Sequence, residues 1–254
     1  MGSGHAHPLH HHGHSRVHHL APEAKVAAAF ATTVAIAVTP REALWAFAVH
    51  AAVLVGVVAI ARLPVRFVLA RLTVILPFVT FALFLPFVAG GEQVDVLGVE
   101  VARDGLWAMA NVLAKATLGA TVSIVLAGTT EASRILMGLE RLRVPAALTT
   151  IATFMLRYLE LIADEITRVR TAMAARGYAP RWLWQARPMA SAAGALFIRS
   201  YERGERVHAA MAARGFTGTM PDLGIRRAGP AEWFVAATVP AFALVVTATA
   251  LLTN

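Results

Sequence analysis

Five apolar stretches constrain the fold of this chain more than any other feature. They cover residues 24–38, 42–61, 67–89, 105–127 and 231–252. An α-helix needs about 20 apolar residues to cross the hydrocarbon core of a bilayer. Hydrophobic residues make up 57% of the chain and charged residues 15%, and the mean hydropathy is +0.62. The sequence therefore predicts an all-α integral membrane protein with about five transmembrane helices.

Prolines mark a turn between the first two predicted spans and interrupt the third. The first stretch is short, and Thr39-Pro40-Arg41 predicts a tight turn that makes a hairpin of the first two spans. The third stretch contains Pro77 and Pro86, which remove backbone donors and predict kinks in the helix.

Basic residues in the loops predict the orientation, because short cytoplasmic loops of membrane proteins are rich in Lys and Arg. Arg62, Arg66 and Arg71 lie around the second connection, whereas residues 90–104 hold four acids and one arginine. We therefore expect the N-terminus and the region between the fourth and fifth spans to be cytoplasmic. The predicted organisation is a His-rich cytoplasmic tail over residues 1–20 and a membrane domain with four spans over 21–127. A cytoplasmic coupling-helix region over 128–230 and a final span over 231–254 follow.

The predicted cytoplasmic region is basic and prone to form helices. Between Glu131 and Arg227 it contains 15 arginines and 8 acids. Pro145 and Pro188 each suit the start of a long helix, the first over residues 146–176 and the second ending at Arg214. The first half of the earlier helix is apolar, so it can follow the membrane surface or edge before it enters water.

An eleven-residue phrase occurs twice in this region, at residues 168–178 and 206–216. The two copies are 38 residues apart. An acid lies four residues before each copy, and an arginine, an alanine and a second arginine follow it at intervals of four. These residues are Asp164, Arg168, Ala172 and Arg176 in the first case and Glu202, Arg206, Ala210 and Arg214 in the second. Residues four apart are neighbours on a helix, so each acid can support its arginine.

Helix capping offers a plain explanation of the ends of both copies. A glycine just beyond the last turn is a common C-terminal cap, and an arginine in that turn complements the helix dipole. Capping alone, however, does not require the shared Arg-Val start or the shared Met173 and Met211. A narrow helix end with a guanidinium is instead suited to bind a carboxylate-lined or carbonyl-lined cleft of a soluble partner.

The duplicated phrase resembles the transmembrane coupling (T) component of energy-coupling factor transporters. That family carries two Ala-Arg-Gly signatures on cytoplasmic coupling helices, and the matching residues are Ala175-Arg176-Gly177 and Ala213-Arg214-Gly215. Residues 17–25 and 200–206 are similar to its cobalt and nickel branch. The resemblance covers residues 17–254 and is most specific over 164–217.

The resemblance implies several partners. Each signature is expected to dock into one of two ATP-binding-cassette ATPase subunits, with support from Asp164, Arg168, Met173, Glu202, Arg206 and Met211. A separate membrane subunit is expected to bind the divalent metal ion, and the lipid bilayer of the bacterial inner membrane surrounds the spans. The family implies no cofactor, no metal ligand and no catalytic residue in this chain, which also lacks a P-loop motif.

Three alternative functions remain open at this point. The cargo of the same kind of subunit could be a vitamin such as biotin, or the basic face could belong to a membrane enzyme acting on an anionic lipid. In the third alternative the chain buffers metal, since eight of the ten histidines precede residue 20: His5, His7, His10, His11, His12, His14, His18 and His19. The net charge of +8 does not indicate nucleic-acid binding, because no recognition motif accompanies it.

Three strongly polar residues, Asn111, Lys115 and His50, lie well inside predicted spans. Asn111 and Lys115 lie one turn apart, and His50 lies within the second span. An unpaired charge in the bilayer costs about 3 kcal/mol or more, so we expect these groups to form contacts between helices.

Overall fold

The computed structural model describes residues 15–90, 93–96, 99–178, 182–218 and 227–253 of the 254-residue chain. Its residues form two compact units. The first, here called the membrane unit, comprises Met1–Leu142 and Arg226–Asn254, and the second, the two-helix unit, comprises Arg143–Ile225. Each unit is considered by itself below.

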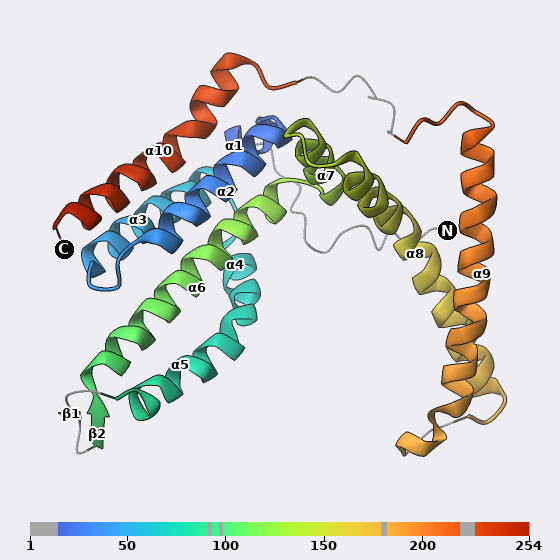
Figure 1. Ribbon diagram of the computed structural model, residues 1–254, viewed down its shortest axis with the longest axis horizontal. Coiled ribbons are helices and arrows are strands. Elements are labelled where there is room, and N and C mark those ends of the chain that lie inside the picture. Colours follow the sequence, from blue (N-terminus) through green and yellow to red (C-terminus); the bar gives the residue numbers. More distant parts are fainter. Residues whose placement is uncertain (1–14, 91–92, 97–98, 179–181, 219–226, 254) are drawn as a thin grey trace. The chain divides into compact units, whose positions relative to one another are not determined.

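Helices dominate the membrane unit (Figure 1). In chain order its elements are α1 (Arg16–His19), α2 (Pro22–Val38), α3 (Leu44–Ile60), α4 (Val65–Leu72), the 3₁₀ turn η1 (Thr73–Ile75), α5 (Leu76–Val88), β1 (Gln93–Val96), β2 (Val99–Ala102), α6 (Arg103–Thr129), α7 (Ala132–Arg141) and α10 (Pro230–Thr253). The described residues thus confirm an all-α membrane fold, to which one short antiparallel hairpin is added.

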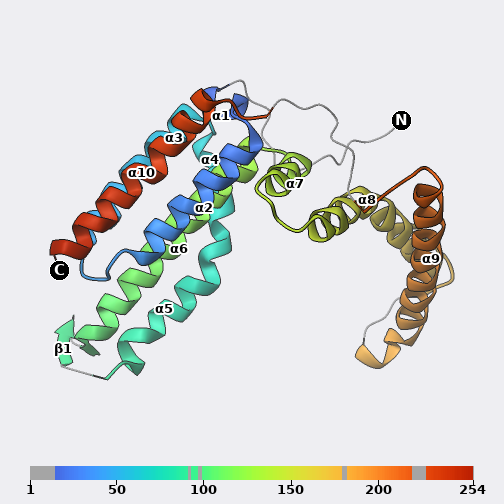
Figure 2. The same ribbon diagram turned by 45° about the horizontal axis from the view of Figure 1, so that its top comes forward.

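Helix α2 packs against both α6 and α10, and the three lie side by side in Figures 1 and 2. One core cluster joins α2, α3 and α6 through Ile36, Phe47, Leu54, Leu118 and Val122. A second cluster joins α4 and the C-terminal end of α3 to α6. A third cluster joins the start of α3 to α10. The third consists mainly of alanines, which let membrane helices approach closely.

The third predicted span is broken where its first proline indicated. The chain passes through η1 just before Pro77, which occupies the first turn of α5. Proline is well tolerated at that position because the amide hydrogen it lacks has no partner inside the helix. Pro77 therefore begins a new helix, while Pro86 lies inside α5.

Four helical segments are long and apolar enough to cross a membrane among the residues that the structure describes: Val65–Val88, Arg103–Thr129, Ala146–Ala175 and Pro230–Thr253. Helices α2 and α3 coincide with the first two predicted spans, but each has only 17 residues. The segment Ala146–Ala175 belongs to the region predicted as cytoplasmic. This segment is long and apolar enough to cross a membrane because its first half is apolar.

The connection predicted as an external loop contains structure of its own. Residues 93–96 pair in antiparallel register with 99–102, with Val96 opposite Val99. The sequence pattern indicates neither this hairpin nor α7 as a separate helix. Helix α7 belongs to the membrane unit, so the two units divide after Leu142, whereas the sequence placed a boundary at residue 128.

The two-helix unit contains α8 (Ala146–Ala175), the 3₁₀ turn η2 (Leu183–Ala186) and α9 (Arg187–Ala212). Pro145 is the N-terminal cap residue of α8, and Pro188 lies in the first turn of α9, as the sequence predicted. The buried residues of α8 are Thr149 and Glu165, and α9 has none among its described residues. Most residues of both helices are therefore exposed within this chain.

Candidate docking site

The two copies of the repeated phrase end in the same backbone structure. In the first copy the amide of Tyr178 donates to the carbonyl of Met173 at 3.0 Å, and the amide of Gly177 donates to that of Ala174 at 2.9 Å. In the second copy Phe216 donates to Met211 and Gly215 donates to Ala212, both at 3.0 Å. This pair of bonds is the Schellman motif, which satisfies the last carbonyls of a helix.

Glycine is required at the third position of each signature. Gly177 has φ +78° and Gly215 has φ +81°, in the left-handed region that costs an L-residue about 1–2 kcal/mol. The capping explanation is thus correct for the two glycines.

Capping also accounts for the shared methionine and aromatic residue. The Schellman motif commonly includes a contact between the side chains that here are Met173 and Tyr178, or Met211 and Phe216. All four are half-buried, although most of their neighbours are exposed. The structure therefore offers a local reason for the methionines, which the sequence analysis had treated as evidence against simple capping.

The arginines are what capping leaves unexplained. Arg176 and Arg214 are exposed, and so are the two alanines that precede each of them. Among the described residues, neither guanidinium forms an ion pair or a side-chain hydrogen bond. Each helix thus ends in small side chains and one available fork of hydrogen-bond donors.

The supporting ion pairs predicted from the four-residue spacing form in one copy. Arg206 and Glu202 approach to 3.9 Å, with both side chains more than half exposed. Within the described part of α8, Asp164 and Arg168 form no such pair. An exposed pair of this kind stabilises a helix by about 0.3–0.5 kcal/mol, so it contributes little to the stiffness of α9.

A different acid, which the sequence analysis missed, joins the two helices. Glu165 of α8 is 9% exposed, and its carboxylate contacts Arg199 of α9 at 3.0 Å and Arg203 at 3.7 Å. The repeat in the sequence could have predicted the contact between Glu165 and Arg203. Glu165 and Arg203 are separated by the same 38 residues as the two signatures, so opposite charges occupy the same position of the two copies.

The polar residues predicted to form contacts inside the membrane unit largely do so. Lys115 of α6 donates its ammonium to the carbonyl of Ala37 at 2.8 Å. The Nε2 atom of His50 lies 3.4 Å from the hydroxyls of both Thr39 and Thr247, which places one hydrogen-bonded cluster between α3, α2 and α10. Asn111 differs, because its buried Oδ1 atom has no partner among the described residues.

One end of α2 carries a polar network that the sequence analysis did not foresee. Glu23 is 4% exposed and accepts hydrogen bonds from Arg141 of α7 at 3.3 Å and from the backbone amide of Ala228 at 2.6 Å. Lys25 donates to the carbonyls of His18 and Thr129. These bonds fasten α7 and the segment before α10 to the start of α2.

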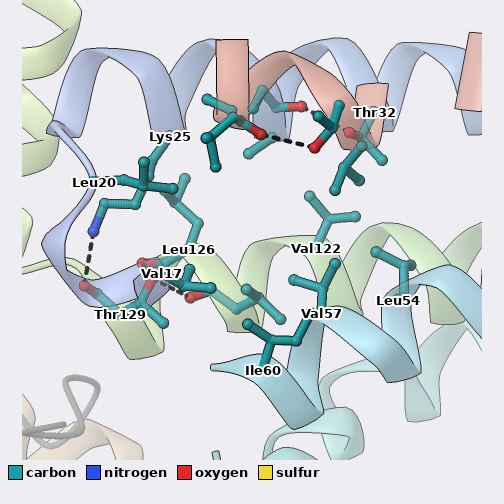
Figure 3. Close-up of a pocket in the computed structure, with 17 residues that line it drawn as sticks. Val17, Leu20, Lys25, Thr32, Leu54, Val57, Ile60, Val122, Leu126 and Thr129 are labelled. Atoms are coloured by element: carbon teal, nitrogen blue, oxygen red, sulfur yellow. Dashed lines mark hydrogen bonds between the residues drawn. The ribbon is translucent and has the colours of Figure 1, made fainter. Parts of the chain in front are cut away.

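A largely apolar cavity of about 320 Å³ lies beside this network (Figure 3). Its walls come from α1, α2, α3, α6 and α10 and include Leu54, Val57, Val122 and Leu126. Lys25 stands at the edge, where its ammonium is bonded to the carbonyl of Thr129. The lining offers no pair of groups suited to acid–base or nucleophilic chemistry.

No cluster of three or more potential metal-ligating side chains occurs in the part of the chain that the structure describes. Most of the histidine-rich leader lies outside that part, and only His18 and His19 of its eight histidines fall within it.

These features define the class of the protein: an integral membrane protein that carries two exposed helices with matched, arginine-bearing ends suited to bind other proteins. Residues 13–223 match the family model described as cobalt transport protein, CbiQ. The chain is also 34% identical over 169 residues to the cobalt transport protein CbiQ of Rhodobacter capsulatus, which covers 66% of this chain and 67% of that relative.

The chain therefore belongs to the CbiQ family of cobalt transport proteins and is a membrane component of cobalt transport. Membership implies that other transport subunits act with it.

Proposed function

We propose that this chain is the transmembrane coupling (T) component of an energy-coupling factor importer for cobalt or nickel ions. It resides in the bacterial inner membrane with its N-terminus in the cytoplasm, and residues 128–230 form its cytoplasmic coupling region. The chain itself performs no catalysis, and ATP is hydrolysed on two partner ATPase subunits. The family match supports the cobalt cargo over a vitamin such as biotin.

The observation that carries this proposal is the pair of exposed arginines on identically capped helix ends. Arg176 and Arg214 each follow two exposed alanines, so a groove can enclose the helix end without steric hindrance. A guanidinium presents several donors in a rigid plane and binds carboxylates or carbonyls at such a groove. One signature docks into each of two ATPase subunits.

The exposed apolar side chains of α8 indicate a second contact. Leu148, Ile151, Met155 and Leu159 are each more than half exposed and recur at helical spacing. Within the proposal, this stripe contacts the membrane subunit that binds the metal ion. Movement of the ATPase subunits then displaces the ends of α8 and α9, and the helices transmit the displacement to that subunit.

A pull-down from the native host membrane tests the docking. The chain is solubilised in mild detergent, and every co-purifying protein is identified by mass spectrometry. Wild type is expected to recover an ATP-binding-cassette subunit, and the Arg176→Ala/Arg214→Ala variant is expected to lose it.

Arg170→Ala is the matched control, because it removes an equally exposed arginine of α8 whose counterpart in the second copy is His208. Retention of the ATPase subunit by the double variant would contradict the proposed docking. Recovery of a vitamin-binding subunit in place of a metal-binding one would redirect the cargo assignment.

A further inference from the structure

The contact between α8 and α9 contains no cluster of buried apolar residues among the residues that the structure describes. The three core clusters found among the described residues all lie in the membrane unit. Between α8 and α9, the polar side-chain contacts formed by described residues are the two ion pairs of Glu165. Figure 1 shows α9 lying across the second half of α8.

Glu165 is the centre of this contact. Its side chain is 11% exposed, and each carboxylate oxygen contacts a different arginine, Oε1 with Arg199 and Oε2 with Arg203. The two arginines are one helical turn apart on α9, so they flank the carboxylate from one face of that helix. A hydrogen bond between charged groups is about twice as strong as a neutral one.

The repeat places this contact at equal distances from the two signatures. Arg176 follows Glu165 by eleven residues, and Arg214 follows Arg203 by eleven residues. At 1.5 Å per residue, each arginine-bearing end lies about 16 Å along its helix from the crossing. A rotation of about 10° at the crossing therefore moves either end by about 3 Å.

We propose that Glu165, with Arg199 and Arg203, is the pivot at which α8 and α9 cross, and that this ion cluster sets the separation of the two Ala-Arg-Gly ends. Glu165 is thus a positioning residue that acts through the helix ends and contacts no partner itself. Since no cluster of buried apolar residues joins the described parts of the two helices, the directional ion pairs select one crossing angle. The effect on docking rests on the proposed function, but the effect on the separation of the ends does not.

The absence of cysteine makes the separation directly measurable in the full-length chain. Spin labels are attached through Ala174→Cys and Ala212→Cys, which replace exposed residues at the same position of the two copies. The labelled protein is placed in lipid nanodiscs, and the distance distribution is recorded by double electron–electron resonance. Glu165→Gln is expected to broaden this distribution by several Å, because a rotation of about 10° displaces each end by about 3 Å.

Two further variants separate the ion cluster from a general effect on folding. Glu160→Gln neutralises an exposed acid of α8 that forms no ion pair in the described structure, and it should leave the distribution unchanged. Glu165→Arg combined with Arg199→Glu and Arg203→Glu exchanges all three charges across the crossing, and it should restore the narrow distribution. Circular dichroism of each variant verifies that the helices remain formed.

An unchanged distribution in Glu165→Gln would overturn the pivot, as would broadening that the charge exchange fails to reverse. Binding of the ATPase subunit is measured on the same Glu165 variants without cysteines or labels, because Ala174 and Ala212 belong to the proposed docking ends. If the distances respond as expected but no variant, including wild type, binds an ATPase, the pivot stands and the proposed docking fails. If wild type binds and the distances do not respond, the docking stands and the pivot fails.

Discussion

Two glycines of α6 predict opposite effects of the same substitution. An ideal Cβ atom on Gly105 would lie 2.6 Å from the carbonyl oxygen of Leu85 and 2.6 Å from the Cα atom of Pro86. Both atoms belong to the backbone of α5, so no side-chain rotation relieves the overlap. A Cβ atom on Gly119, in the same helix, meets nothing within 4 Å.

The magnitudes follow from these distances. Ordinary van der Waals contact begins at 3.4 Å, so Gly105→Ala must move α5 and α6 apart by nearly 1 Å. Overpacking of this kind costs about 1–3 kcal/mol. Gly119→Ala removes only the entropic penalty of glycine in a helix and stabilises by about 0.5–1 kcal/mol. The two variants should therefore differ by about 1.5–4 kcal/mol in the free energy of unfolding.

Unfolding by sodium dodecyl sulfate in mixed micelles, followed by tryptophan fluorescence and circular dichroism, measures both variants against wild type. We expect the transition of Gly105→Ala to shift to lower detergent fraction and that of Gly119→Ala to shift slightly higher. Equal stability of the two alanine variants would refute the inferred close approach of α5 and α6.

Further predictions concern the docking ends and the leader. Arg176 and Arg214 have no ion-pair partner in the described structure, so their replacement by Ala should leave the stability of the protein unchanged. The same replacement should weaken ATPase binding by at least about 2 kcal/mol, or about 30-fold in Kd. Biolayer interferometry measures this binding, with Arg170→Ala as the control. Gly177→Ala should cost about 1–2 kcal/mol locally and speed hydrogen exchange at the amide of Tyr178; unaltered exchange would contradict the cap. Thr247→Val should lower the free energy of unfolding by about 1 kcal/mol through loss of the cluster with His50, as judged by the same detergent titration. Deletion of residues 1–14 should preserve co-purification of the ATPase subunit. If the protein instead buffers metal, the deleted protein should lose the principal signal in isothermal titration with Co²⁺, and cobalt uptake should fail.

Local features of this protein could be read from its sequence with little error. The helices at 146–175 and 187–212 begin beside prolines and end before glycines, as predicted. Their ends depend on backbone hydrogen bonds among residues five positions apart or fewer, so the determinants lie within one short segment. The apolar stretches likewise located α2, α3, α6 and α10 to within a few residues.

Partial predictions show where local reasoning stops. The spacing of Asp164 and Arg168 allowed an ion pair, but spacing gives only proximity, and the described structure forms the equivalent pair only between Glu202 and Arg206. The loop before α6 was recognised by its acids, yet its hairpin was not, because short alternating segments carry little signal.

By itself, the sequence determined that this is an all-α membrane protein, where the long helices begin and end, and that two of them share one capped, arginine-bearing end. The tertiary structure alone decided which helix faces meet. It placed Gly105 against the backbone of α5, Glu23 beside α7 and the start of α10, and Glu165 between Arg199 and Arg203. These contacts join residues far apart in the chain, and their partners depend on the rotation and crossing of whole helices, which no local pattern specifies.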